Sequence, residues 1–252
     1  MPNAVFAAFS EAFSTYKREL VPCILFSLAT YFVGAVLSII LLAIALFLGV
    51  FSIGGVVSAL ISGKNFSLEV AGLLAATLVV AGGMIVFLLV QGGLSASYLE
   101  SLYILYSGKK QTLFGLFYRI PRYAVRMLGL TLLSGIILLM PIVAGILLSS
   151  FIGWGMASIA IILASILFAL FLGVFMMFAV PSIIIDDSGP LDSLKRSATF
   201  VVRNIGKSAA FIVVSSLLSL LAAIPLIGFI YFILVYLPIT QIALLALYKK
   251  SH

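Results

Sequence analysis

Long runs of apolar residues, separated by short polar segments, organise this sequence. Several runs exceed the length of about 18 residues that indicates a transmembrane helix. They are continuous rather than alternating, which argues against a membrane β-barrel. The pattern predicts a single all-α domain over residues 1–252, a polytopic integral membrane protein with six transmembrane helices. The predicted spans are residues 21–48, 68–93, 127–149, 156–180, 207–223 and 227–247.

Three short segments with one apolar and one polar face precede the predicted pairs of spans. They are residues 3–18, 112–122 and 190–203, with Thr112 as a cap of the second and Pro190 in the first turn of the third. Two expected apolar stripes are Val5, Phe9, Ala12, Phe13 and Tyr16, and Leu191, Leu194, Ala198, Val201 and Val202. Such segments are too short to cross a bilayer. We therefore expect three transmembrane hairpins, each preceded by an amphipathic helix at the cytoplasmic interface.

Glycine and proline suggest where the spans are interrupted. We expect a turn or short interfacial helix over residues 49–62, and an external loop at Lys64. The Gln91-Gly92-Gly93 sequence is expected to loosen the second span, with residues 94–106 continuing as a helical extension. Pro181 is expected to end the fourth span.

The succession of surface helix, span, turn and span suggests an internal repeat. The units would be residues 1–110, 111–187 and 188–252, arranged around a pseudo-threefold axis. Leu132-Leu133-Ser134-Gly135 before Pro141 resembles Leu217-Leu218-Ser219-Leu220 before Pro225. The alternative is that any six-span protein with cytoplasmic linkers shows such a pattern.

The charged residues indicate orientation. Charged residues make up 8% of the chain, the mean hydropathy is +1.37, and the net charge is +7. Thirteen of the 14 Lys and Arg residues fall on one side of the six predicted spans, with Lys64 on the other. The positive-inside rule then places both termini in the cytoplasm. Basic residues at the ends of apolar runs favour anionic lipid head groups over nucleic acid as partners.

The polar segment from Asp186 to Gly206 carries a family resemblance. It combines an acidic turn, Asp186-Asp187, with the pair Arg196-Ser197 and with Asn204 before the next span. This pattern resembles a loose superfamily of prokaryotic six-span membrane proteins, which includes the membrane domain attached to some glycerophosphoryl diester phosphodiesterases. The resemblance implies a six-span fold in a prokaryotic plasma membrane, and it implies no enzyme activity, because no phosphodiesterase catalytic domain is present.

Catalytic and metal-binding chemistry finds little support in the sequence. Cys23 is the single cysteine and His252 the single histidine, so neither a disulfide nor a site with several Cys or His ligands is expected. Asp186 and Asp187 are the one adjacent acidic pair that could hold an ion, and the simpler interpretation is that they favour the start of the next helix. We expect no enzyme, no cofactor and no metal.

The sequence leaves two possible functions open. The first is a non-catalytic membrane protein whose surface helices contact anionic lipid or a partner membrane protein, through Lys17, Arg18, Arg119, Arg122, Arg126, Lys195, Arg196, Arg203 and Lys207. The alternative is a transporter or channel-like pathway for a neutral or lipidic substrate. Since no charge lies in the core of a predicted span, such a pathway would depend on Gln91, Thr131 and Gln241.

Overall fold

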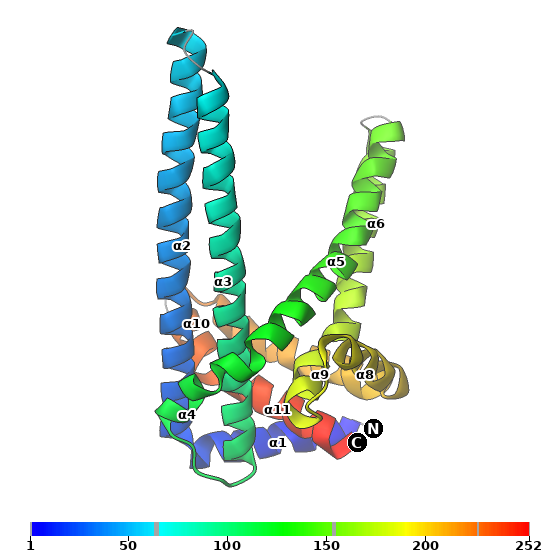
Figure 1. The fold of residues 1–252 in the computed structure, drawn as a ribbon. Helices are drawn as coiled ribbons and strands as arrows, with labels where there is room; N and C mark the ends of the chain where they lie inside the picture. Colours follow the sequence, from blue (N-terminus) through cyan, green and yellow to red (C-terminus); the bar gives the residue numbers. More distant parts are fainter. Residues whose placement is uncertain (1, 63–65, 153–154, 226, 252) are drawn as a thin grey trace.

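The computed structural model describes residues 2–62, 66–152, 155–225 and 227–251, and this part of the chain is built of helices without a strand (Figure 1). The helices are α1 (Pro2–Arg18), α2 (Leu20–Ser62), α3 (Phe66–Tyr106), α4 (Leu113–Tyr118), α5 (Ile120–Ile152), α6 (Met156–Met176), α7 (Ala179–Ile185), α8 (Pro190–Arg203) and α9 (Ile205–Ser219), then a 3₁₀ turn η1 (Leu220–Ala223), α10 (Ile227–Tyr231), a π-helical turn η2 (Phe232–Tyr236) and α11 (Leu237–Ser251). The predicted external loop at Lys64 lies outside the described residues.

Six helical segments are long and apolar enough to cross a membrane, which confirms the all-α prediction and is compatible with a multi-pass membrane protein. They are Leu20–Val50, Ala71–Tyr106, Ile120–Phe151, Met156–Ile185, Ile205–Ala223 and Ile227–Lys250. In Figure 1, α2 lies beside α3, and α5 beside α6, and both pairs rise from a base that holds the two termini.

Helix α2 does not end where we expected. It continues without a break through residues 49–62, to a length of 43 residues, or about 65 Å at 1.5 Å per residue. Both predicted alternatives for residues 49–62, a turn and a separate interfacial helix, are therefore wrong. Glycine weakens a helix only modestly, and an uninterrupted helix satisfies its own backbone hydrogen bonds in an apolar environment.

Helix α3 also runs without interruption to Tyr106, so the loosening expected at Gln91-Gly92-Gly93 is absent. The two glycines instead allow α3 to approach α5 closely. A Cβ atom on Gly92 would lie 2.8 Å from the Cβ of Met127, and one on Gly93 would lie 2.6 Å from the carbonyl oxygen of Ile120. Small residues serve the same purpose wherever membrane helices pack tightly.

Proline positions shift several predicted boundaries. The third span begins at Ile120 rather than near 127, because Pro121 fits the first turn of α5. Helix α6 ends at Met176, and Pro181 lies inside the short α7 instead of ending the fourth span. The sixth span contains the π turn η2 just before Pro238, a residue without the backbone N–H that a regular α-helix would use at this position.

The largest buried core lies at the base. It joins α1, the first turns of α2, the end of α3, and α4, α7, α8, α9 and α11. Helix α1 packs on α9 and α11 and buries Val5, Phe9, Ala12 and Tyr16, whereas Phe13, expected in the same stripe, is 47% exposed. Away from the base the paired helices expose most of their apolar side chains, as expected for surfaces that face lipid.

Candidate functional site

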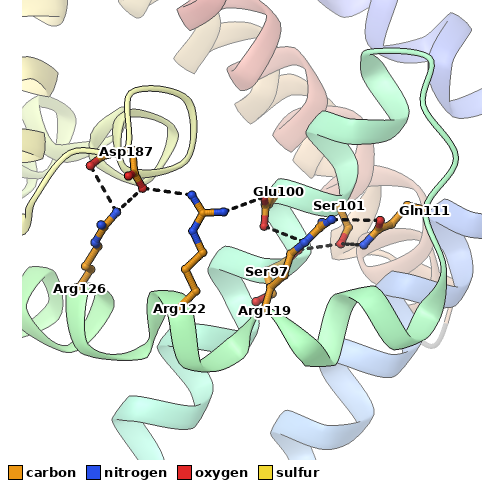
Figure 2. Close-up of polar contacts among 8 residues, drawn as sticks. All are labelled: Ser97, Glu100, Ser101, Gln111, Arg119, Arg122, Arg126 and Asp187. Atoms are coloured by element: carbon orange, nitrogen blue, oxygen red, sulfur yellow. Dashed lines mark hydrogen bonds and ion pairs between the residues drawn. The ribbon is translucent and has the colours of Figure 1, made fainter.

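A cluster of charged residues joins α3, α5 and the loop between α7 and α8 (Figure 2). Glu100 of α3 lies between two cations: its Oε2 is 3.5 Å from Nε of Arg119, the residue that caps α4, and its Oε1 is 3.9 Å from Nη1 of Arg122. The side chain of Glu100 is only 14% exposed. Two arginines therefore compensate one half-buried carboxylate at the base.

Asp187 completes the cluster from the other side. Its Oδ1 accepts hydrogen bonds from Nη2 of Arg122 at 3.3 Å and from Nη1 of Arg126 at 2.5 Å. The Arg126 guanidinium, and then that of Arg122, lowers the pKa of the Asp187 carboxyl below its usual value. Asp187 has a φ of +52°, a left-handed conformation that Asp tolerates better than most residues. The two arginines thus hold the turn that leads into α8.

The inner end of this cluster contains polar atoms with few partners. Gln111 lies between Ser101, 3.5 Å from its Nε2, and Nη2 of Arg119, 3.4 Å from its Oε1. The Oγ of Ser97, Oε2 of Glu100 and Nη1 of Arg119 are buried and form no hydrogen bond within the described part of the chain. The predicted lipid contacts Arg119, Arg122 and Arg126 do share one face, and that face meets carboxylates of the protein itself.

The residues of the acidic and Arg-Ser motif have internal partners. Asp186 accepts a 2.6 Å hydrogen bond from the hydroxyl of Tyr248 and pairs with Arg196 at 3.2 Å. Asp186 and Asp187 therefore point to different partners rather than into one site. Among the described residues, no three His, Cys, Asp or Glu side chains lie close enough together to hold a metal ion.

Ser197 and Asn204 each stabilise a helix end. The buried Ser197 hydroxyl donates to the carbonyl oxygen of Phe175 at 2.6 Å and accepts from the backbone N–H of Phe178 at 3.0 Å. It thereby pairs both backbone groups where α6 gives way to α7. Helix α8 ends at Arg203, as predicted, and Asn204 donates from Nδ2 to the carbonyl oxygen of Phe200 at 3.2 Å.

The remaining predicted cations differ in their surroundings. Lys17 lies 4.7 Å above the ring of Phe13, and Arg18 donates to the carbonyl oxygen of Leu105 at 3.2 Å. Lys195 is exposed at the edge of an apolar groove between α5, α6 and α8, while Arg203 is exposed at the end of α8. Neither Lys195 nor Arg203 has an ion-pair partner among the described residues. Lys207 lies in the first turn of α9.

A second candidate site is a pocket of about 340 Å³ where α2, α3, α5, α7 and α11 approach one another. Two of the predicted pathway residues, Gln91 and Gln241, line this pocket, although 150 positions separate them. Thr131, the third, lies elsewhere on α5 and is exposed. Thr30 and Tyr31, which the sequence pattern does not single out, also line it.

Comparisons with known proteins give one family. A family of unknown function, DUF7544, matches residues 107–250, from the loop before α4 to the end of α11. Searches of curated proteins and of solved structures found no match. The matched region holds Asp186, Arg196, Ser197 and Asn204, whose contacts stabilise the base, and the arginines of the charged cluster. Because the match extends over more than half of the chain, the protein belongs to the DUF7544 family of unknown function.

Proposed function

We propose that the protein is a non-catalytic, multi-pass protein of a prokaryotic plasma membrane, with both termini in the cytoplasm, and that its helix α8 binds an anionic phospholipid. The observation that carries the proposal is the apolar groove beside Lys195. The prokaryotic membrane follows from the resemblance of the segment 186–204, and the orientation from the distribution of basic residues.

The groove suits an acyl chain. It has a volume of about 490 Å³ and is lined by side chains of α5, α6 and α8, among them Ile137, Phe171, Phe175, Leu191 and Leu194. Lys195 is the one charged residue among the described residues that line it. Leu191 is 55% exposed, although it was expected in the buried stripe of α8. An exposed leucine beside a lysine, on the short helix α8 between two of the long apolar segments, is suited to the boundary between acyl chains and head groups.

Charge favours an anionic head group over a zwitterionic one. Lys195 and Arg203 lie on the exposed side of α8 without ion-pair partners in the described part of the chain, whereas Arg119, Arg122 and Arg126 are compensated by Glu100 and Asp187. Lipid contact therefore centres on α8 rather than on the start of α5. A basic residue near an anionic membrane surface contributes about 1 kcal/mol to binding.

Binding of defined lipids to the purified, delipidated protein tests the proposal. We expect phosphatidylglycerol to bind more tightly than phosphatidylcholine, and Lys195→Gln to weaken phosphatidylglycerol binding about fivefold, the factor that corresponds to about 1 kcal/mol. Lys110→Gln is the matched control, since Lys110 is exposed in a loop away from the groove. Equal binding of the two lipids, or equal losses in the two variants, would contradict the proposal.

A further inference from the structure

The pocket between α2, α3, α5, α7 and α11 has polar groups but no charge. Its hydrogen-bonding side chains are Thr30 and Tyr31 of α2, Gln91 and Ser95 of α3, and Gln241 of α11. Tyr98 lies beside them, and among the described residues no Asp, Glu, Lys, Arg or His lines the pocket. Every one of these residues belongs to a helical segment apolar enough to cross a membrane. Such a concentration of polar groups within apolar helices is unusual and indicates a site.

Two of these polar groups have no partner. Thr30 is 4% exposed, and its Oγ1 forms no hydrogen bond within the described part of the chain. The side-chain Oε1 of Gln91 is likewise buried without a partner there. A buried polar atom without a hydrogen bond destabilises the folded protein, so a pair of them in one pocket points to a group that is supplied from outside.

Two of the neighbouring polar side chains, those of Tyr98 and Ser95, have hydrogen-bond partners within the protein. The hydroxyl of Tyr98 shares a 2.8 Å hydrogen bond with that of Ser27, and Ser95 donates to the backbone carbonyl of Gln91 at 2.9 Å. Gly34 makes room for the amide, because a Cβ atom there would lie 2.9 Å from Oε1 of Gln91. The fold thus accommodates an amide group at a place where nothing in the protein pairs with its oxygen.

We propose that this pocket binds the polar end of a neutral lipid that carries a free hydroxyl group. The hydroxyl donates its proton to Oε1 of Gln91 and accepts a hydrogen bond from Oγ1 of Thr30, after these two side chains turn their oxygens from the protein interior into the pocket that they line. A charged ligand would find no counter-charge among the lining residues. A neutral ligand avoids that cost.

The apolar walls account for the rest of such a ligand. Met127, Met177 and Leu244 line the pocket beside the polar groups, and flexible methionines adapt to irregular apolar shapes. The volume of about 340 Å³ is near the lower end of the range for ligand pockets, about 300 to 1,000 Å³, so it fits a polar end and its first carbons. The acyl chains then lie along the helices outside. This site is separate from the groove at Lys195, so neither proposal depends on the other.

The test uses the full chain in phosphatidylcholine nanodiscs and two photoreactive diacylglycerol probes, one with its free hydroxyl and one with that hydroxyl capped as a methyl ether. We expect the free-hydroxyl probe to crosslink to peptides of α2 and α3 that line the pocket, and the capped probe to do so at least about fivefold less. Gln91→Leu and Thr30→Val should reduce crosslinking of the free-hydroxyl probe to a similar extent. Thr131→Val, on α5 outside the pocket, should leave it unchanged.

Stability measurements separate lost binding from lost folding. Because Gln91→Leu removes a buried amide oxygen without a partner, its unfolding temperature without probe should equal or exceed that of the wild type. If Gln91→Leu does not fold, Thr30→Val, which keeps the shape of the side chain, carries the test. Equal crosslinking of the two probes, or wild-type crosslinking in a folded Thr30→Val, would overturn the proposal.

Discussion

The hydroxyl of Tyr16 in α1 donates a hydrogen bond to the carbonyl oxygen of Leu234, 2.9 Å away and 218 positions later in the chain. Leu234 stands four residues before Pro238, which has no N–H to complete the helical hydrogen bond that this carbonyl would otherwise accept. A residue of the first helix thus supplies a hydrogen bond to the carbonyl group whose α-helical donor is missing at Pro238.

Replacement of Tyr16 tests this relationship. Tyr16 is 6% exposed, and Tyr16→Phe leaves the part-buried Leu234 carbonyl without this partner, so it should lower the free energy of unfolding by about 1–3 kcal/mol. Thermal unfolding in detergent measures the change. Tyr118→Phe is the control, because Tyr118 is 87% exposed and should unfold at the wild-type temperature. A similar unfolding temperature for both variants would contradict the assignment.

The close approach of α3 and α5 gives a second prediction. Gly93→Ala should destabilise the protein by about 1–3 kcal/mol, because the added methyl group meets the backbone of Ile120 and Ala124, at 2.6 Å from the Ile120 carbonyl oxygen and 3.3 Å from the Ala124 Cα. Gly82→Ala is the matched control in the same helix, since nothing lies within 4 Å of its Cβ position. There alanine should be neutral or stabilising by up to about 1 kcal/mol.

The hydroxyl of Ser197 gives a third prediction. Ser197→Ala leaves both the Phe175 carbonyl and the Phe178 N–H without their side-chain partner, so we expect a loss of about 1–3 kcal/mol in unfolding free energy. Thr199→Ala should cost much less, because the exposed Thr199 hydroxyl only bonds the carbonyl oxygen of Lys195 in its own helix. Equal losses in the two variants would show that the break between α6 and α7 does not depend on Ser197.

Asp187 predicts a dependence of stability on pH. Arg126, and to a smaller extent Arg122, hold the pKa of the Asp187 carboxyl below the usual value of about 3.9. The contribution of this carboxylate to stability is therefore fully present above that value. The contribution is lost as the pH falls through the lowered native pKa. Asp187→Asn, which keeps the tolerance for positive φ, should therefore unfold at a lower temperature than wild type at pH 7, and the difference should shrink towards pH 3.

Asp192→Asn is the control for that experiment. It removes an exposed carboxylate of α8 that has no ion-pair partner in the described part of the chain. Its unfolding temperature should track that of the wild type between pH 7 and pH 3. A difference for Asp187→Asn that stays constant across this range would contradict the role of the carboxylate charge.

Cysteine labelling tests the orientation. Cys23 is fully buried, so a membrane-impermeant maleimide should report mainly on introduced cysteines. We expect Lys109→Cys to be labelled only after cells are permeabilised, and Ser150→Cys, near the opposite end of α5, to be labelled in intact cells. Labelling of position 109 in intact cells would contradict both the orientation and the proposed role of α8.

The sequence predicts the helical class and the apolar segments well, because continuous apolar length decides both. Where it fails, a tertiary contact outweighs a local signal. Gly92 and Gly93 suggest an interruption of the helix, yet α3 is continuous at these positions. The absence of side chains there lets α3 pack closely against α5. Pro181 suggests a helix end, yet it lies within α7, and Phe178, the residue before this helix, donates its backbone N–H to Ser197. The threefold repeat stays a prediction.

The candidate sites were predictable only in part. Gln91 and Gln241 stand out as polar residues in apolar spans, and the fold brings them to one pocket. Thr30 gives no such signal, because a threonine in a helix usually bonds its own backbone, and its lack of a partner appears only in three dimensions. The three arginines are regularly spaced, but their spacing does not reveal that Glu100 and Asp187 face them.

The length of α2 has a consequence for the membrane around it. Its first turns are enclosed by protein at the base, where Cys23, Phe26 and Ser27 are buried, and the rest of its roughly 65 Å still exceeds a hydrocarbon layer of about 30 Å. A bilayer with longer acyl chains covers more of the helix length that exceeds about 30 Å than a bilayer with shorter chains does. Hydrophobic mismatch then makes the protein sensitive to bilayer thickness, and thick membranes favour the upright pair of α2 and α3 over a tilted one.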